Sequence, residues 1–485
     1  MSSPLPAFSD LNQFVELLQQ RGQLAVIDEP VDPVLEISEI CDRVVKRGGP
    51  ALLFRQVKGH PFPVLINTFG SRERISWALR CHDLDDLARE IDQLLEPEIP
   101  KGFFAKLQLL PKIKRLMDTS SRLVSNGPCQ EVIETASPSL KEIPILQCWP
   151  LDAGRYITLP VVVTRHPSRR SRNLGMYRLQ VFDERTLGMH WQRHKGGAHH
   201  YRVAEGRRSR IEAAIALGPD PATIYSATAP LPDEVDELLL AGFLRRKPVD
   251  LVKCKTVDLE VPAESQFVLE GYVDPDERRI EGPFGDHTGF YSLPEEYPVF
   301  HLTAVTRRRH PIYPTIIVGI PPQEDGWLGK ATERLFLPLI RKTLPEVVDM
   351  NLPVEGIFHN LAIVSIDKKY PGHAKKVMHA LWGLGQLMFT KVVIVADRDC
   401  NVQDLREVAW RVGTHIDPRR DVLFSEGVMD VLEFASQAAD YGSKMGIDAT
   451  TKWPDEGFSR EWPPVIRMSP EVKKRVDDLW PRLGL

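Results

Sequence analysis

The chain has 485 residues, which is more than one ordinary hydrophobic core supports, so two or three domains are expected. Apolar residues make up 42% and charged residues 26% of the chain, which is typical of a soluble protein with sizeable cores. The 62 basic and 66 acidic side chains nearly cancel, which argues against nucleic acid or a charge-driven membrane surface as a partner.

The N-terminus has no basic flank followed by a long apolar run, and no apolar stretch approaches the roughly 20 residues of a membrane span. The six cysteines are scattered and form no CxxC pair, which is typical of reduced, structural thiols. A cytoplasmic location is therefore expected.

The first part of the chain, residues 1–117, is predicted to be an α/β domain. Residues 10–21 carry apolar side chains at helical spacing, with Ser9 as a candidate cap and Gly22 after the end. A second helix ends at Gly48-Gly49. Strands are expected at 51–54 and 63–67, and a third helix near 83–95.

In residues 118–309 the sequence pattern changes to strand-like runs, which predict a mainly antiparallel sheet or barrel. Strand-like runs occur at 158–165, 174–182, 187–192, 257–262 and 266–273, with a tight DERT turn between the second and third.

Residues 310–440 show an alternation of strands and helices that predicts an open α/β sheet. Strands are expected at 361–366, 391–396 and 422–424, and helices at 373–384 and 402–412. Residues 441–485 are predicted to be an irregular tail that packs on the body or on a partner subunit.

Polar residues then accumulate on the predicted strands of the middle region. Arg178 lies in an otherwise apolar run, so its guanidinium must be paired or bind an anion, unless it points to water from an edge strand. Asn173 lies five residues earlier, which on a regular strand is the opposite face. The two residues therefore serve different ends of a site, or Asn173 precedes the strand.

A second polar cluster comprises His190, Trp191, Gln192, His194 and Lys195, and His199-His200 extend it. Gly196-Gly197 would let the backbone approach a ligand closely. Since the chain has neither a P-loop nor a GxGxxG motif, a phosphate here would be held by side chains, a metal and backbone together. HKGGAHH does not match a zinc spacing.

Glu237 lies on the apolar side of a predicted helix. A carboxylate there needs a partner, for which a cation is one option; the alternative is a favourable charge in a first turn capped by Asp233. Asparagine, histidine and glutamate ligands would suit manganese or magnesium better than zinc.

The stretch EGPFGDHTGFY places Glu281 and Asp286 around a bend that contains Gly282, Pro283 and Gly285. Two acids that face one cavity push their pKa values apart, and a cation such as Arg178 would keep one of them ionised. The alternative is a surface turn with two solvated acids.

Taken together, NLGMYR, HKGG, PLPDEVDE and EGPFGDHTGFY resemble the UbiD family of aromatic-acid decarboxylases in order and spacing, over nearly the full chain. The resemblance implies an N-terminal α/β domain, a central flavin-reductase-like split β-barrel and a C-terminal α/β domain used in oligomerisation. It also implies prenylated FMN and Mn2+ or Mg2+ as cofactors, with K+ as a further cation.

The resemblance assigns roles residue by residue. It implies metal ligands at Asn173, His194 and Glu237, and a catalytic trio of Arg178, Glu281 and Asp286, in which some relatives have glutamate in place of the last residue. It implies cofactor contacts at Met176, Tyr177, Arg178, His190, Trp191, Gln192, Lys195 and Gly196. Asp286 would donate a proton, so a raised pKa is expected for its carboxyl.

Within the family, the resemblance is strongest to the decarboxylases that convert 3-polyprenyl-4-hydroxybenzoate to 2-polyprenylphenol in ubiquinone synthesis. It implies a flavin prenyltransferase as cofactor supplier, a homo-oligomer (dimer or hexamer) and peripheral membrane contact for a lipid-tailed substrate. The alternatives are a menaquinone-pathway enzyme, an enzyme for another aromatic or heteroaromatic acid with IPPQEDGWLG (320–329) and Leu159 lining the pocket, a flavin reductase, and a non-catalytic flavin-binding or assembly module.

Overall fold

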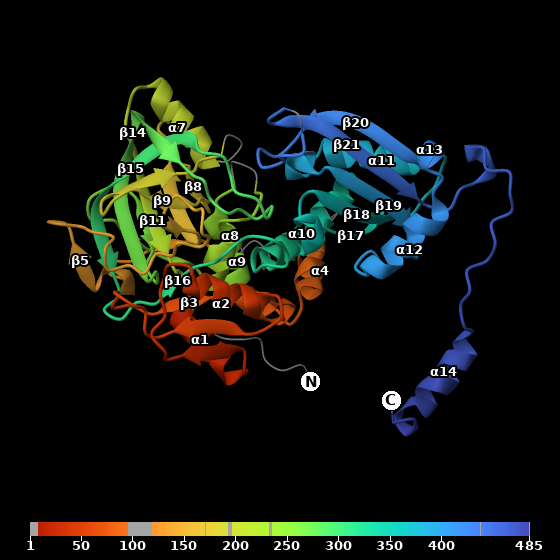
Figure 1. Cartoon of the computed structure of the whole chain (residues 1–485), viewed down its shortest axis with the longest axis horizontal. Helices are drawn as coiled ribbons and strands as arrows, with labels where there is room; N and C mark the ends of the chain where they lie inside the picture. The colour runs from red at the N-terminus through yellow and green to blue at the C-terminus, as the bar shows by residue number, and fades with distance from the viewer. Residues whose placement is uncertain are drawn as a thin grey trace, which may run out of the picture.

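The structure is a computed structural model and describes residues 8–95, 119–169, 171–192, 196–231, 235–436 and 438–484. Figure 1 shows an N-terminal α/β unit, a central unit dominated by strands, and a C-terminal α/β unit beyond helix α10. This arrangement confirms the expected fold class with one refinement. Among the described residues, the central sheet ends at β6 and β8, which do not pair with each other, so it does not close into a barrel.

The N-terminal unit packs helices against a sheet with the strand order β1-β2-β3-β16. Its elements are α1 (Leu11–Gln20), β1 (Leu24–Ile27), α2 (Glu36–Val45), β2 (Ala51–Phe54), β3 (Val64–Ile66), α3 (Arg72–Ala78), α4 (Leu84–Leu95) and, from later in the chain, β16 (Tyr313–Pro314). Asp10, not Ser9, caps α1, because its side chain accepts the Gln13 N–H at 3.0 Å. Gly22 follows the helix with a φ of 66°.

The central unit is built on an antiparallel sheet with the order β6-β9-β10-β15-β14-β11-β7-β8. Its strands are β5 (Val132–Glu134), which pairs with β15, β6 (Tyr156–Ile157), β7 (Pro160–Arg165), β8 (Arg172–Gly175), β9 (Leu179–Val181), β10 (Thr186–Met189), β11 (Ile211–Leu217), β14 (Phe267–Glu281) and β15 (Glu295–Arg307). A small sheet of β4 (Arg122–Leu123), β12 (Asp250–Lys253) and β13 (Glu260–Pro262) accompanies η1 (Pro128–Gln130), α7 (Gly196–Gly206), α8 (Pro221–Ser226) and α9 (Glu237–Arg245).

The run 174–182, predicted as one strand, is interrupted. Strand β8 ends at Gly175 and β9 begins at Leu179, so Arg178 is in an irregular segment and not inside a strand. The chain leaves the ladder here because the Met176 N–H donates to the Ala227 carbonyl at 3.1 Å, away from the sheet. The period-2 argument about the faces of Asn173 and Arg178 therefore does not apply.

The C-terminal unit has a sheet with the order β17-β18-β19-β21-β20. Its elements are α10 (Asp325–Thr343), β17 (Val347–Asn351), η2 (Val354–Gly356), β18 (Leu361–Ile366), α11 (His373–Trp382), η3 (Gly385–Phe389), β19 (Val392–Asp397), α12 (Leu405–His415), α13 (Pro418–Asp421), β20 (Val422–Val428) and β21 (Tyr441–Ala449). Residues 441–449 were assigned to the tail from the sequence, but they form β21. Their polar and glycine-rich composition hides a strand that is paired on both sides.

Two cores and one connecting helix hold these units together. Ile37 of α2, Phe54 of β2 and Phe300 of β15 belong to one buried cluster, so the N-terminal and central units form one body. Helix α10 begins with Leu328 in a second buried cluster of the body, the main core, and ends with Ile340 in the core of the C-terminal unit. It packs along α4 on its way, so it connects the body to the C-terminal unit (Figure 1).

Beyond β21 the chain passes through η4 (Pro454–Glu456), where Glu456 pairs with Lys368, to α14 (Pro470–Leu479) and η5 (Trp480–Arg482). Helix α14 lies apart from the rest of the chain (Figure 1). The segment beyond β21 exposes large apolar side chains, among them Ile466 and Trp480. In the described part of the chain, no helix combines the length and the apolar character that a membrane crossing requires.

Candidate active site

The EGPFGDHTGFY stretch forms a tight loop at the end of β14. The Asp286 N–H donates to the Phe290 carbonyl at 3.0 Å, and the Gly289 N–H donates to the Asp286 carbonyl at 2.9 Å. Gly282 and Gly289 have φ values of 93° and 82°, in the region that favours glycine. The loop therefore fixes Asp286 close to Glu281, the last residue of β14.

Asp152, which the sequence did not single out, braces this loop. Its Oδ1 accepts the Gly285 N–H at 2.8 Å, and its Oδ2 accepts the N–H groups of Cys148 and Trp149 at 3.0 and 2.8 Å. Burial raises the pKa of Asp152 to about 6 despite these hydrogen bonds. The only sequence signal for this role is CWPLDAG, since a brace that acts through backbone groups leaves no side-chain pattern in the loop that it holds.

Arg178 lies between the two acids. Its Nε and Nη2 donate to the Glu281 carboxylate at 2.8 and 3.1 Å, and its Nη1 donates to Asp286. Nη2 also donates to the Ser292 hydroxyl at 3.1 Å. Glu281 is 0% exposed and Asp286 is 7% exposed, so neither the solvated turn nor the water-facing arginine describes this structure. Of the five guanidinium N–H groups, one on Nη1 is left without a partner among the described residues.

The charges set the protonation of both acids. Burial raises the pKa of Glu281, but contacts from His190 and Arg178 outweigh burial and lower the pKa to about 2. Burial likewise raises the pKa of Asp286, and Arg178 and His287 outweigh it, so that this pKa lies well below its usual range. The raised pKa expected for Asp286 is therefore wrong for this arrangement, because both acids pair with the Arg178 guanidinium, which neutralises their charges.

His190 and Trp191 carry buried polar atoms without protein partners among the described residues. His190 Nδ1 lies 3.1 Å from Glu281 Oε2 and its ring stacks on Tyr297 at 4.2 Å, while His190 Nε2 is buried and unpaired. Trp191 Nε1 is also buried and unpaired. Such atoms are rare in native proteins, and a polar ligand in this site would satisfy them.

The start of α7 comes close to Asn173. A Cβ on Gly196 would lie 2.0 Å from Asn173 Oδ1, so this position has no room for a side chain. The Gly197 N–H donates to the Tyr177 hydroxyl at 3.0 Å, and Asn173 Nδ2 donates to the same hydroxyl at 3.2 Å. Backbone N–H groups at the start of a helix, beside an asparagine oxygen, suit the phosphate of a nucleotide cofactor.

Glu237 is the first residue of α9, which Asp236 caps; Asp233, the predicted cap, lies outside the described residues. Glu237 Oε2 accepts the Leu174 N–H at 3.0 Å, and Leu174 directly follows Asn173. Burial raises the pKa of Glu237 to about 7, which is the behaviour of a carboxylate that lacks a neutralising cation. The donor set of Asn173 and Glu237 fits a hard divalent ion such as Mn2+ or Mg2+.

The other predicted residues have mixed outcomes. His194 and Lys195 lie outside the described residues. Met176 packs on the main core and Gln192 is half-buried next to Trp191. His199 and His200 do not extend the cluster as expected, because their rings pack against His166 instead, and His200 Nδ1 lies 2.9 Å from the Thr164 hydroxyl.

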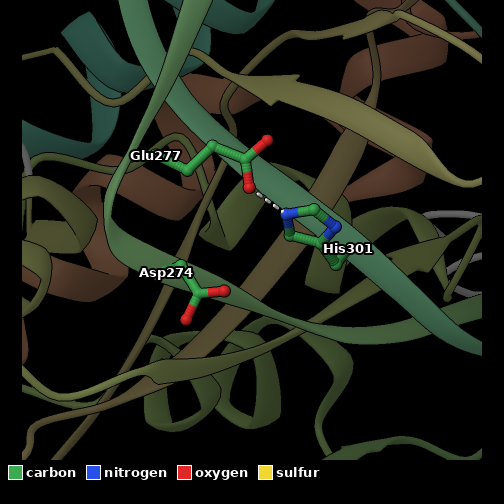
Figure 2. Close-up of side chains that lie close together, drawn as sticks. All are labelled: Asp274, Glu277 and His301. Atoms are coloured by element: carbon green, nitrogen blue, oxygen red, sulfur yellow. Dashed lines mark hydrogen bonds and ion pairs between the residues drawn. The ribbon is translucent and has the colours of Figure 1, made fainter.

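A separate cluster of possible metal ligands comprises Asp274, Glu277 and His301 (Figure 2). His301 Nε2 lies 2.5 Å from Glu277 Oε2, and Arg279 donates to the other oxygen of Glu277 at 3.0 Å. Arg210 donates to both oxygens of Asp274 at 2.5 and 3.2 Å. Because arginines already neutralise both carboxylates, the cluster is a salt-bridge network at the bulge of β14.

The fold and this site place the protein among the carboxy-lyases. Profiles of the N-terminal, Rift-related and C-terminal domains of 3-octaprenyl-4-hydroxybenzoate carboxy-lyase match residues 15–94, 122–321 and 326–449. The chain belongs to the UbiD family.

Similar proteins agree with this assignment. An uncharacterized protein of Aquifex aeolicus is 52% identical, over 99% of each chain. The UbiD-class enzyme HmfF of Pelotomaculum thermopropionicum, solved in complex with FMN, is 32% identical with a TM-score of 0.81, over 96% of this chain and 98% of that one. Vanillic acid decarboxylase of Sedimentibacter hydroxybenzoicus, in its closed form, is 28% identical with a TM-score of 0.85, over 98% and 99%.

Proposed function

We propose that this protein is a non-oxidative decarboxylase of an aromatic acid that uses prenylated FMN and a divalent metal ion, with Mn2+ as the first candidate. The observation that carries this proposal is Arg178 buried between Glu281 and Asp286. A cation that binds a carboxylate, an acid that supplies a proton and the exclusion of water are what decarboxylation requires from side chains. A neighbour solved with prFMN, an evolved dimeric form of HmfF, supports the choice of cofactor.

The cofactor would be held by the residues that have unsatisfied polar atoms or no room for a side chain. Asn173 and Glu237, with His194, would bind the metal that tethers the phosphate, and Gly196 would let it approach the backbone. His190 and Trp191 would offer their buried nitrogens to the ring system. The chemistry that prenylated FMN supplies when bound is an electron sink for the electron pair left on the aromatic carbon when CO2 departs.

The chain's own residues would bind the substrate carboxylate and deliver the proton. Decarboxylation turns an aromatic carboxylate and one proton into CO2 and a new C–H bond. The substrate carboxylate would bind Nη1 of Arg178, which holds the one guanidinium N–H that has no partner among the described residues. The substrate carboxylate would compete with Asp286 for this position on Arg178. Once Asp286 is displaced from the cation and lies beside the substrate carboxylate, it takes up a proton more readily. Glu281 would stay ionised and keep Arg178 oriented.

The specific substrate that we propose is 3-polyprenyl-4-hydroxybenzoate. Four large apolar side chains on or beside the EGPFGDHTGFY loop are 64–66% exposed: Leu151, Phe290, Leu293 and Ile320. Such a surface suits a substrate with a long apolar tail and contact with the membrane that contains it. Leu159 is fully buried in the core, so it has no place on this surface. The second candidate is a simple acid of the vanillic type, which the vanillic acid decarboxylase neighbour favours.

The test of decarboxylation is Asp286→Asn in protein coexpressed with a flavin prenyltransferase. The amide keeps the size of the side chain but cannot deliver a proton, so turnover should fall by ~10²–10⁴-fold while cofactor binding persists. Asp276→Asn, at an exposed position of β14, the strand that leads into this loop, is the matched control. Wild-type CO2 release from Asp286→Asn would refute the assignment, and parallel assays with polyprenylated and simple hydroxybenzoates decide between the two substrates.

We also propose that the protein is a homo-oligomer. Helix α14 and the residue that follows it expose Val476, Leu479 and Trp480, and this helix lies apart from the body of its own chain, so a partner subunit is the surface that would cover it.

A further inference from the structure

His287, directly after Asp286, is tied to that acid by its ring as well as by its backbone. Its Nδ1 lies 2.8 Å from Asp286 Oδ1, and its backbone N–H donates to the same oxygen at 2.7 Å. The other carboxylate oxygen binds Arg178. The acid therefore lies between a guanidinium, which keeps its protons at all working pH values, and an imidazole, which can give one up near neutrality.

A loop of the C-terminal unit holds the other side of the His287 ring. His359 Nε2 lies 2.9 Å from His287 Nε2, and the Phe358 ring stacks on His287 at 5.4 Å with an interplanar angle of 26°. Ile357 and Phe358 have φ values of 58° and 41°. This left-handed conformation is unfavourable for branched and aromatic residues, and it persists only where the surroundings impose it. The strained loop thus presents Phe358 and His359 to His287.

The charges around His287 favour its protonated form. Besides Asp286 on its own loop and His359 on the C-terminal loop, Asp325 at the start of α10 and Asp430 after β20 act on its ring. Burial lowers the pKa of His287, but the hydrogen bond to Asp286 and the negative charges of these three aspartates outweigh burial and raise it. Without substrate and at a pH below the raised pKa of His287, the pair is an imidazolium and a carboxylate that share one transferable proton.

We propose that His287 stores the proton that Asp286 delivers, and that His359 positions the His287 ring by accepting its Nε2–H. This inference rests on the proposed decarboxylation. When the substrate displaces Asp286 from Arg178, the proton moves from His287 Nδ1 to Asp286 Oδ1 and then to the aromatic carbon as CO2 leaves. The neutral His287, whose side chain is 17% exposed, regains a proton from water before the next turnover. One proton is consumed and one CO2 is released in each cycle.

This arrangement also makes the proton supply depend on the position of the C-terminal unit. His287 belongs to the body and His359 to the C-terminal unit, and the hydrogen bond joins the two. When the units separate, the His287 ring loses its acceptor and its stacking partner. The proton is therefore held in the right place only while the two units are in contact.

The first experiment measures kcat, KM and their pH dependence in the cofactor-loaded enzyme. His287→Gln should lower kcat by about 10²-fold with little change in KM, and the loss of activity at high pH that reports the imidazolium should disappear. Imidazole should restore turnover to His287→Gly but not to His287→Gln. His359→Gln, whose amide oxygen can still accept the Nε2–H, should stay within about threefold of the wild type, since one neutral acceptor replaces another.

His359→Leu removes the acceptor, so its activity should be lost at a lower pH than in the wild type. The sign follows because an imidazolium without its hydrogen-bond acceptor has a lower pKa and gives up its proton earlier as pH rises. His379→Gln, at an exposed position of α11 in the same unit, is the matched control and should leave kcat and the pH profile unchanged. A wild-type kcat and pH profile in His287→Gln would overturn the proposal.

The second experiment needs no cofactor. In protein with ¹⁵N-labelled histidine, the His287 resonances should titrate above free histidine, and both Asp286→Asn and His359→Leu should lower that titration. An His287 titration that neither substitution moves would overturn the proposal even if the enzyme is active. If the titrations behave as expected but the loaded wild type releases no CO2, the proposed decarboxylation fails while the coupling of His287 to Asp286 and His359 stands.

Discussion

Glu281→Gln tests the electrostatic reasoning about the site, because it changes one charge and almost no volume. Glu281 is 0% exposed, and its carboxylate accepts hydrogen bonds from Arg178 Nε at 2.8 Å, Arg178 Nη2 at 3.1 Å and His190 Nδ1 at 3.1 Å. The glutamine amide can still accept a hydrogen bond from Arg178 through its oxygen, but its NH2 group then faces a group of Arg178 or His190 that is itself a donor. Among the described residues, Arg178 would be left with Asp286 as its only anionic partner.

The pKa of Glu281 gives the size of the effect. It falls from 4.5 to about 2 in the folded protein. Each tenfold change in proton affinity is worth about 1.4 kcal/mol, so the ionised carboxylate contributes about 3 kcal/mol to folding at neutral pH. Removal of one partner of a buried ion pair costs ~3–5 kcal/mol in other proteins, which agrees with this magnitude.

The sign of the pH dependence follows from the lowered pKa. The contribution of Glu281 is fully present above pH 4.5 and is lost as pH falls toward 2. The stability difference between wild type and Glu281→Gln should therefore be about 3 kcal/mol at pH 7 and smaller by about 1 kcal/mol at pH 4. Urea unfolding of the cofactor-free protein, followed by tryptophan fluorescence at the two pH values, measures both quantities.

Glu296→Gln is the matched control, since Glu296 is an exposed residue of β15 beside the same loop, and its effect should stay within about 0.5 kcal/mol. A Glu281→Gln variant as stable as this control would refute the assignment of Glu281 as a buried, ionised partner of Arg178. In the cofactor-loaded enzyme, the same substitution should alter the ultraviolet-visible spectrum as well as the rate, because the charge next to the proposed cofactor site changes.

Two further predictions concern the cofactor and the assembly. In the proposed site, phosphate and protein ligands share one ion, so Glu237→Ala should empty the metal site and the cofactor site together; full prenylated-FMN occupancy in this variant, measured by absorbance and metal analysis, would contradict the ligand set. Truncation after residue 457 removes α14 and its apolar residues, so sedimentation should show a smaller particle than the full chain gives, and an active monomeric full chain would contradict the oligomer.

The sequence by itself predicted the order of most elements and the candidate residues of the site. Helical spacing and apolar runs predicted α1, β18 and α11 almost to the residue, because a buried face repeats with a fixed period along one element. Arg178, Glu281 and Asp286 stood out because a charge within an apolar or glycine-rich run needs a partner. Periodicity failed at 441–449, where a polar strand is paired between two neighbours, and at 174–182, where one backbone hydrogen bond leaves the sheet.

Only the tertiary structure decided the pKa values, and so the protonation, of the acids in the site. Two acids five residues apart predict mutual repulsion and a raised pKa, but the fold inserts Arg178 from 103 residues earlier between them and lowers the pKa of both. Asp152 and His359 reach the same loop from 133 and 72 residues away. Electrostatic energy depends on distance through space, and spacing along the chain does not contain that distance until the sheet and the C-terminal unit have formed.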